Sequence, residues 1–225
     1  MYSLEFIYKS DHCLNNLNLF LKRCSFFTHI VLIDKKTINR GDPLSLAQKL
    51  KNDFNIGVWI TLSLGDKNML YVESILKKIS KIGVDGVILV SGDFNTMNVD
   101  FKKAALLLKS IDSKTMLLSA TDDVAKAKER LSYGFDFVIT QSLYSLSSLN
   151  KFLSHFEDES RIFPSFFPFF NSSTLNRWRV NKFGINIPND YEISQNREIF
   201  NAFIKKQRLH ISMLDSNFNN LLTLF

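Results

Sequence analysis

The sequence predicts a single (β/α)8 TIM barrel that spans residues 1–225 as one domain. Apolar runs of strand length alternate with amphipathic helical runs along the chain, and the strand-like runs number eight. Strands that are apolar on both faces are typical of a closed parallel barrel. No Gly-rich phosphate loop follows the first strand, which disfavours the alternative, an open doubly wound sheet.

The expected strands are short runs rich in Val, Ile, Leu and Phe. In chain order they are Tyr2–Tyr8, His29–Asp34, Gly57–Leu64, Gly86–Ser91, Thr115–Ser119, Phe135–Thr140, Arg161–Phe167 and His210–Leu214. The low content of Gly (8 residues) and Pro (4 residues) favours regular elements joined by short loops.

The helical runs between these strands carry apolar residues at intervals of three and four. They are Asn16–Arg23, Leu44–Asp53, Met69–Ile82, Phe101–Ile111, Val124–Ser132, Leu146–Phe156 and Thr174–Asn181, with an extra helix over Asn189–Arg208 and a closing one over Phe218–Phe225. Asp42 and Pro43 are typical of a helix start, and Gly83 and Gly134 of helix ends.

Composition narrows the class of protein. Hydrophobic residues make up 45% of the chain, and no apolar run approaches the roughly 18 residues of a membrane span, so we expect a soluble protein. Two cysteines without a CxxC motif and no recognisable leader favour a reducing cytoplasm. The net charge of +6 favours anionic partners, but the basic residues are scattered and predict no nucleic-acid patch.

Candidate functional residues lie where strands are expected to end, because (β/α)8 barrels build their active sites there. Glu5 is a carboxylate inside an apolar strand; burial would raise its pKa and make it a general acid, unless it faces outward toward a helix lysine. Asp93 follows Gly92 and either contacts a ligand or caps a turn. Gln141 is either a ligand contact or a loop hydrogen bonder.

Metal and nucleophile chemistry find little support in the sequence. The four histidines, His12, His29, His155 and His210, have no partner at the spacing typical of metal ligands, so we expect no metal. No GxSxG motif occurs, and Cys13 beside His12 is expected in a loop.

Several short motifs resemble the methylenetetrahydrofolate reductases. Ser3-Leu4-Glu5-Phe6 is similar to the first-strand motif of that family, Val90-Ser91-Gly92-Asp93 to its fourth-strand motif, and Val138-Ile139-Thr140-Gln141 to its sixth-strand motif. The stretch Phe183–Pro188 is similar to a segment before the family's extra helix. The chain departs from the family at Ser91, at Trp59-Ile60-Thr61-Leu62, and after Ser119, where flavin contacts are expected.

The resemblance implies reduction of methylenetetrahydrofolate to the 5-methyl form, within one-carbon metabolism and methionine biosynthesis. It implies Glu5 and Asp93 as catalytic residues, Gln141, Asp93 and Thr61 as contacts of a tetrahydrofolate-type pterin, and Asp93, Gly92 and Ser119 as cofactor contacts. The hydride source stays open between FAD, NAD(P)H donating directly, and a partner redox subunit. The expected assembly is either a homo-oligomer or a complex with such a subunit.

Three alternatives remain at this point. A non-catalytic or partner-dependent folate-binding homologue would explain the departures at the flavin positions. The other two are a barrel enzyme of another kind and a basic nucleic-acid-binding barrel.

Overall fold

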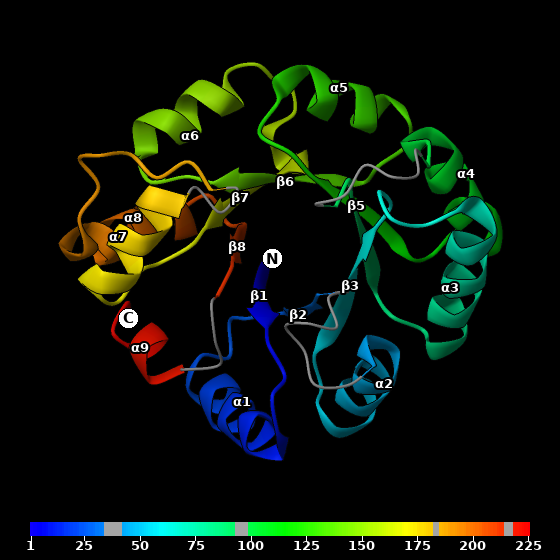
Figure 1. Cartoon of the computed structure of the whole chain (residues 1–225), viewed down its shortest axis with the longest axis horizontal. Helices are drawn as coiled ribbons and strands as arrows, with labels where there is room; N and C mark the ends of the chain where they lie inside the picture. The colour runs from blue at the N-terminus through cyan, green and yellow to red at the C-terminus, as the bar shows by residue number, and fades with distance from the viewer. Residues whose placement is uncertain (34–41, 93–98, 182–184, 214–217) are drawn as a thin grey trace.

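The protein is a closed eight-stranded parallel barrel, as the sequence predicts. The computed structural model describes residues 1–33, 42–92, 99–181, 185–213 and 218–225. Strands β1 to β8 pair in chain order, and β8 closes the ring on β1. Helices surround the barrel, and the N-terminus lies near its centre (Figure 1).

The strands lie close to the expected runs. They are β1 (Tyr2–Phe6), β2 (His29–Leu32), β3 (Gly57–Ser63), β4 (Gly86–Val90), β5 (Met116–Ala120), β6 (Phe137–Ser142), β7 (Ile162–Phe166) and β8 (Leu209–Ile211). A register shift lies between Ile139 and Ser142 on β6, where this strand pairs with β7. The differences from the expected runs are confined to the strand ends.

The α-helices alternate with the strands, and two short 3-10 helices, η1 and η2, are added to them. They are α1 (Asp11–Arg23), α2 (Pro43–Asp53), α3 (Met69–Ile82), α4 (Phe101–Ile111), α5 (Val124–Ser132), α6 (Leu146–Leu153), η1 (Glu159–Arg161), α7 (Ser172–Asn181), η2 (Ile193–Gln195), α8 (Asn196–Ile204) and α9 (Phe218–Leu222). In the described ranges, no helix is long and apolar enough to cross a membrane.

Local chemistry explains the helix boundaries. The Asp42 carboxylate accepts a hydrogen bond from the Ser45 backbone N–H at 3.0 Å, which confirms the predicted helix start. Gly83 (φ 70°) and Gly134 (φ 90°) adopt the left-handed conformation just after α3 and α5, as predicted. Helix α1 begins at Asp11, earlier than predicted, with Ser10 as its N-cap.

The predicted helix Asn189–Arg208 is wrong in its first part. The carbonyl oxygens of Pro188, Asn189 and Tyr191 accept hydrogen bonds from the Arg179 guanidinium on α7. These carbonyls therefore point at a side chain instead of at helical N–H groups. The continuous α-helix runs only from Asn196 to Ile204.

The hydrophobic core has two parts because side chains alternate between the two faces of each strand. Leu4 and Phe6 of β1 pack against the surrounding helices, in the larger cluster. The smaller cluster fills much of the barrel interior and consists of Val31, Trp59, Ile88, Leu118, Ile139 and Phe163. These residues come from β2 to β7, so neither β1 nor β8 contributes a buried residue to this apolar cluster.

Candidate active site

The barrel interior is polar where β7, β8 and β1 adjoin. His210 of β8 is in register with Ser3 of β1 on one side and with Ser165 of β7 on the other. All three side chains are buried. Glu5 follows two positions after Ser3 and therefore lies on the same face of β1. We call Ser3, Glu5, Ser165, His210 and Ser212 the polar sector.

Glu5 is the carboxylate of this sector. Its side chain is only 17% exposed. It takes part in hydrogen bonds with the Ser212 side chain and the Met213 backbone. Burial raises the pKa of Glu5 from 4.5 to about 7, against the opposing effect of these hydrogen bonds. The outward orientation toward a helix lysine, the alternative interpretation of the sequence, is excluded.

His210 lies next to Glu5, and the other side of its ring is hydrogen-bonded to Ser3. The Nδ1 atom of His210 is 3.0 Å from the Ser3 hydroxyl oxygen, and its Nε2 atom is 3.9 Å from Glu5 Oε2. Burial lowers the pKa of His210 to about 4, so the imidazole is neutral at pH 7. When Ser3 donates to Nδ1, the remaining proton sits on Nε2 and points toward the Glu5 carboxylate.

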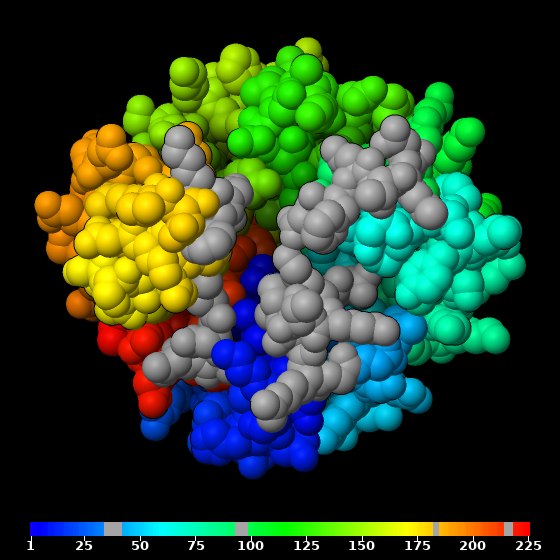
Figure 2. Space-filling model, viewed as in Figure 1, coloured from blue at the N-terminus to red at the C-terminus, as the bar shows by residue number. Residues whose placement is uncertain are grey.

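This part of the barrel is open to solvent at one end. Figure 2 shows a hollow in the middle of the face in view, with dark-blue atoms of β1 and orange-red atoms of β8 in its floor. Glu5 and Ser212 lie at or just beyond the carboxyl ends of these two strands. The arrangement therefore offers a partly accessible acid–base group where this fold places its chemistry.

The structure separates the other predicted site residues. Thr61 of β3 lies on the same strand face as interior Trp59, and Gln141 is exposed near the end of β6. The Ser119 hydroxyl donates to the Leu89 carbonyl at 3.1 Å and is fully buried on the opposite face from Leu118, outside the polar sector.

Gly92 has a structural reason to be glycine. Its φ is +81°, and a Cβ atom there would lie 2.1 Å from the Ser63 Oγ atom. The close approach of β3 and β4 thus accounts for this residue without a ligand. Asp93, predicted to be catalytic and to bind both substrate and cofactor, lies outside the described residues.

Sequence reasoning did not identify Ser3, Ser165, His210 or Ser212 as site residues. The signal for His210 is its position between Leu209 and Ile211, which pack outward and so turn the histidine inward. For metals, the described ranges contain no group of three or more His, Cys, Asp or Glu side chains that could hold an ion.

Comparison with solved structures finds enzymes of the same fold at low sequence identity. Orotidine 5′-phosphate decarboxylase from Pyrococcus horikoshii OT3 matches with a TM-score of 0.61 and 9% identity, over 100% of this chain and 97% of that one. Oxaloacetate acetylhydrolase in complex with oxalate matches with a TM-score of 0.60 and 11% identity, over 98% of this chain and 76% of that one. Phosphonopyruvate hydrolase in complex with oxalate and Mg²⁺ matches with a TM-score of 0.60 and 8% identity, over 100% of this chain and 78% of that one. No family model matches the sequence, and no curated protein does.

These findings correct the resemblance to methylenetetrahydrofolate reductases. The structural matches are orotidine decarboxylase and enzymes such as 2,3-dimethylmalate lyase, a member of the PEP mutase/isocitrate lyase superfamily, and not folate reductases. The expected reductase function, with its folate and flavoprotein chemistry, is therefore wrong. The motifs that suggested it are strand segments of a few residues, and Gly92 and Ser119 within or near them have packing roles in this barrel.

Proposed function

We propose that this protein is an enzyme that catalyses proton transfer on a small carbonyl compound, in the manner of an isomerase or lyase. Glu5 is the general acid–base group. The observation that supports this most is a single carboxyl group in the polar sector, 17% exposed, with a pKa of about 7. A general acid–base group works best when its pKa lies near the working pH.

The surrounding groups suit a base that removes a proton from carbon. The hydrogen bonds with Ser212 and the Met213 backbone orient the Glu5 carboxylate. His210 stays neutral, so it offers Glu5 no opposite charge that would depress the pKa. The Glu5 carboxylate takes the proton next to the carbonyl and returns it to the same or a neighbouring atom.

Hydrogen–deuterium exchange on a panel of small carbonyl compounds tests this function. The protein is incubated in D2O with 2-oxo acids, hydroxyketones and sugar aldehydes, and loss of the C–H signal next to the carbonyl is followed by NMR. We expect at least one compound to exchange. Its rate should rise with pH and level off above about 7, where Glu5 is ionised.

The matched variants are Glu5→Gln and Glu73→Gln. Glu73 is a surface carboxylate of α3 that pairs with Lys77 at 2.6 Å. Glu5→Gln should lower the exchange rate about 10²-fold or more, and Glu73→Gln should leave it unchanged. Exchange that survives Glu5→Gln, or a panel in which no compound exchanges, would contradict the proposal.

A further inference from the structure

The inward-facing side chains of this barrel lie in layers of four. In an eight-stranded barrel of this kind, alternate strands supply the members of each layer. Because the strands tilt, side chains at one height advance by about one residue from each strand to the next. Applied to the strand register, this places in one layer Glu5, Thr61, Ala120 and Ser165, from β1, β3, β5 and β7. We call this set the Glu5 layer.

The strand faces confirm that the other three members point into the barrel. Thr61, Ala120 and Ser165 each lie two positions after a residue of the smaller core cluster, so they share the inner face of their strands with it. Ala120 also packs directly against that cluster. The four side chains therefore surround one part of the barrel interior.

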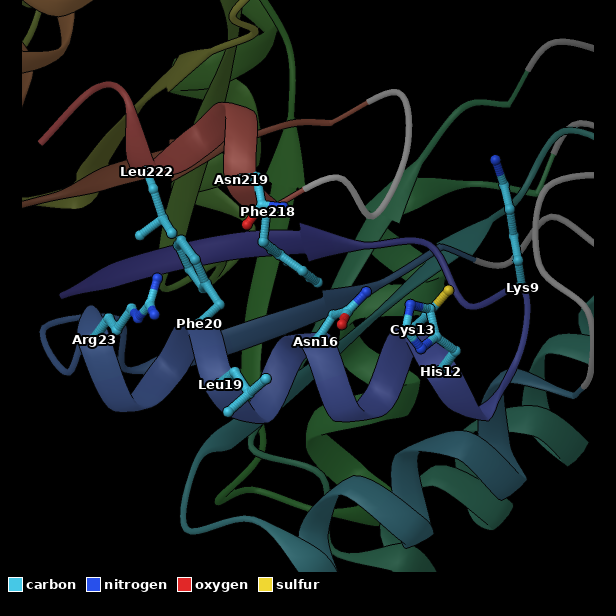
Figure 3. A pocket seen from close by; sticks show the side chains of 10 residues that line it. All are labelled: Lys9, His12, Cys13, Asn16, Leu19, Phe20, Arg23, Phe218, Asn219 and Leu222. Atoms are coloured by element: carbon cyan, nitrogen blue, oxygen red, sulfur yellow. The ribbon is translucent and has the colours of Figure 1, made fainter.

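The outer face of β1 is closed to ligands. Phe218 of α9 stacks on Phe6 of β1 and on Phe20 of α1, and the two helices lie along this strand (Figure 3). All three rings are buried. A ligand therefore reaches Glu5 from the barrel interior, through the hollow in Figure 2.

The Glu5 layer contains three small side chains. Bulky branched residues usually fill the layers of such a barrel, whereas Thr61, Ala120 and Ser165 leave space beside Glu5. Strand β5 lies four strands from β1 in either direction around the ring, so Ala120 faces Glu5 across the barrel. Thr61 and Ala120 are partly exposed, which keeps the layer accessible from the mouth. A barrel of this width has room for one small ligand.

Glu5 is the only side chain in this part of the interior that is charged at pH 8. The layer below consists of Val31, Ile88, Ile139 and His210, and the layer above of Ile33, Val90, Gln141 and Ser212. His210 is neutral because burial lowers its pKa to about 4. A carboxylate ligand would therefore lie beside ionised Glu5 without a cation from these layers, which is unfavourable.

We propose that the Glu5 layer is the substrate pocket and that it takes a short, uncharged hydroxyketone, whose apolar end lies against Ala120. The hydroxyls of Thr61 and Ser165 flank the polar end, and the carbon that carries the substrate hydroxyl lies next to Glu5. Ala120 limits the length of the substrate. This inference rests on the proposed proton transfer by Glu5 and names the class of compound on which it acts.

Saturation-transfer NMR at pH 8 tests the pocket, because it measures binding whether or not turnover occurs. The probes are hydroxyacetone, pyruvate, which has a carboxylate in place of the hydroxymethyl group, and dihydroxyacetone, which has a second hydroxymethyl group in place of the methyl. We expect hydroxyacetone to bind at least tenfold more tightly than pyruvate, because of the like charge. Dihydroxyacetone should bind several-fold more weakly than hydroxyacetone, because its second hydroxyl meets the Ala120 methyl.

Substitutions of Ala120 locate the bound probe. Ala120→Leu fills the space opposite Glu5 and should weaken hydroxyacetone binding at least tenfold. Ala125→Leu makes the same change on the exposed face of α5 and should leave binding unaltered. Ala120→Gly enlarges the pocket and should improve binding of 1-hydroxybutan-2-one, which is longer by one carbon. Cooperative unfolding of each variant verifies that it is folded, and Ala120→Gly carries the test if Ala120→Leu does not fold.

Glu5→Gln separates the pocket from the catalysis. It removes the charge and keeps the space, so it should still bind hydroxyacetone and should bind pyruvate more tightly than the unchanged protein does. Hydroxyacetone binding that depends on Ala120, with no exchange of any compound, would support the pocket and contradict the role of Glu5. Equal binding of pyruvate and hydroxyacetone, or equal binding of hydroxyacetone to folded Ala120→Leu and the unchanged protein, would overturn the pocket while exchange by Glu5 could still stand.

Discussion

Glu5 and His210 respond to pH in opposite directions although they are neighbours. The pKa of Glu5 is raised to about 7, so the folded protein binds its proton more tightly than the unfolded chain does. The pKa of His210 is lowered to about 4, so the folded protein binds that proton less tightly. Their effects on stability therefore oppose each other between about pH 4.5 and 6.5.

Single substitutions should separate these two effects. The stabilisation from protonated Glu5 is complete below about pH 4.5 and is lost as the pH rises through 7. The glutamine of Glu5→Gln does not titrate. As the pH rises from 4.5 to 8, the free energy of unfolding of this variant should therefore increase by about 3 kcal/mol relative to that of the unchanged protein. Urea unfolding at intervals of pH measures the difference.

His210→Asn is the opposite test. The unchanged protein loses stability as the pH falls from 6.5 through 4, because the unfolded histidine takes up a proton that the folded one resists. The variant should lack that loss. If the stability difference between either variant and the unchanged protein is independent of pH, the pKa of that group is not shifted in the folded protein.

Individual residues show where sequence reasoning succeeds and where it stops. Glu5 could be predicted because a carboxylate in an apolar strand is rare enough to demand a reason. His210 could be placed inside the barrel from its apolar neighbours but not assigned to a site, because a histidine between apolar residues is equally typical of a packed core residue. What distinguishes it is Ser3, which is 207 positions away in the sequence and 3.0 Å away in space.

Two glycines at element boundaries allow conformational strain to be compared with steric overlap. Gly83 after α3 and Gly92 after β4 both have positive φ, 70° and 81°. A Cβ at Gly83 would have no atom within 4 Å, whereas one at Gly92 would meet Ser63 Oγ at 2.1 Å.

Alanine at the two positions should therefore have different costs. Gly83→Ala should lower the free energy of unfolding by about 1 kcal/mol, from the left-handed backbone alone. Gly92→Ala should cost about 2 to 4 kcal/mol, since overpacking adds to the same strain. Thermal or urea unfolding of both variants compares them, and equal costs would mean that Ser63 moves away freely.

Elements with strong local signals could be predicted closely, and those set by distant contacts could not. Helix α3 has both Asn68 as N-cap and Gly83 as C-cap, and its predicted range Met69–Ile82 is confirmed. The start of the predicted Asn189–Arg208 helix fails because Arg179, on another helix, binds the carbonyls there. Nothing in the local sequence reports that contact.

The last helix is joined to the first strand by a stack of phenylalanines. Phe218 of α9 stacks on Phe6 of β1, with ring centroids 6.1 Å apart, and on Phe20 of α1. Phe218 is 4% exposed. The closing helix thus packs against the outer face of β1 and against α1.

Removing this ring should destabilise the whole molecule. Phe218→Ala should cost about 3 to 5 kcal/mol, as truncation of a buried phenylalanine usually does. Leu106→Ala on α4, where the side chain is 58% exposed, should change stability by less than about 0.5 kcal/mol. Urea unfolding compares the two, and similar costs would show that α9 packs only loosely.

At the scale of the molecule, the architecture could be predicted from the sequence and the family could not. Alternating units constrain the chain to few topologies, and the number of strands together with the absence of a Gly-rich phosphate loop favours the barrel among them. The function depends on which side chains converge inside the ring, and strand motifs of three or four residues are shared by chance at this length. The position of His210 next to Glu5 and Ser3, which the structure gives, is what indicates a buried acid–base group in the barrel interior.

The closure of β8 on β1 has a consequence for how the protein is made. Strand β1 is synthesised well before its second neighbour, Leu209–Ile211, which lies far along the chain. Until then β1 is an edge strand with unpaired N–H and C=O groups, and such edges template aggregation. The nascent chain therefore exposes a strand edge that the finished barrel does not have.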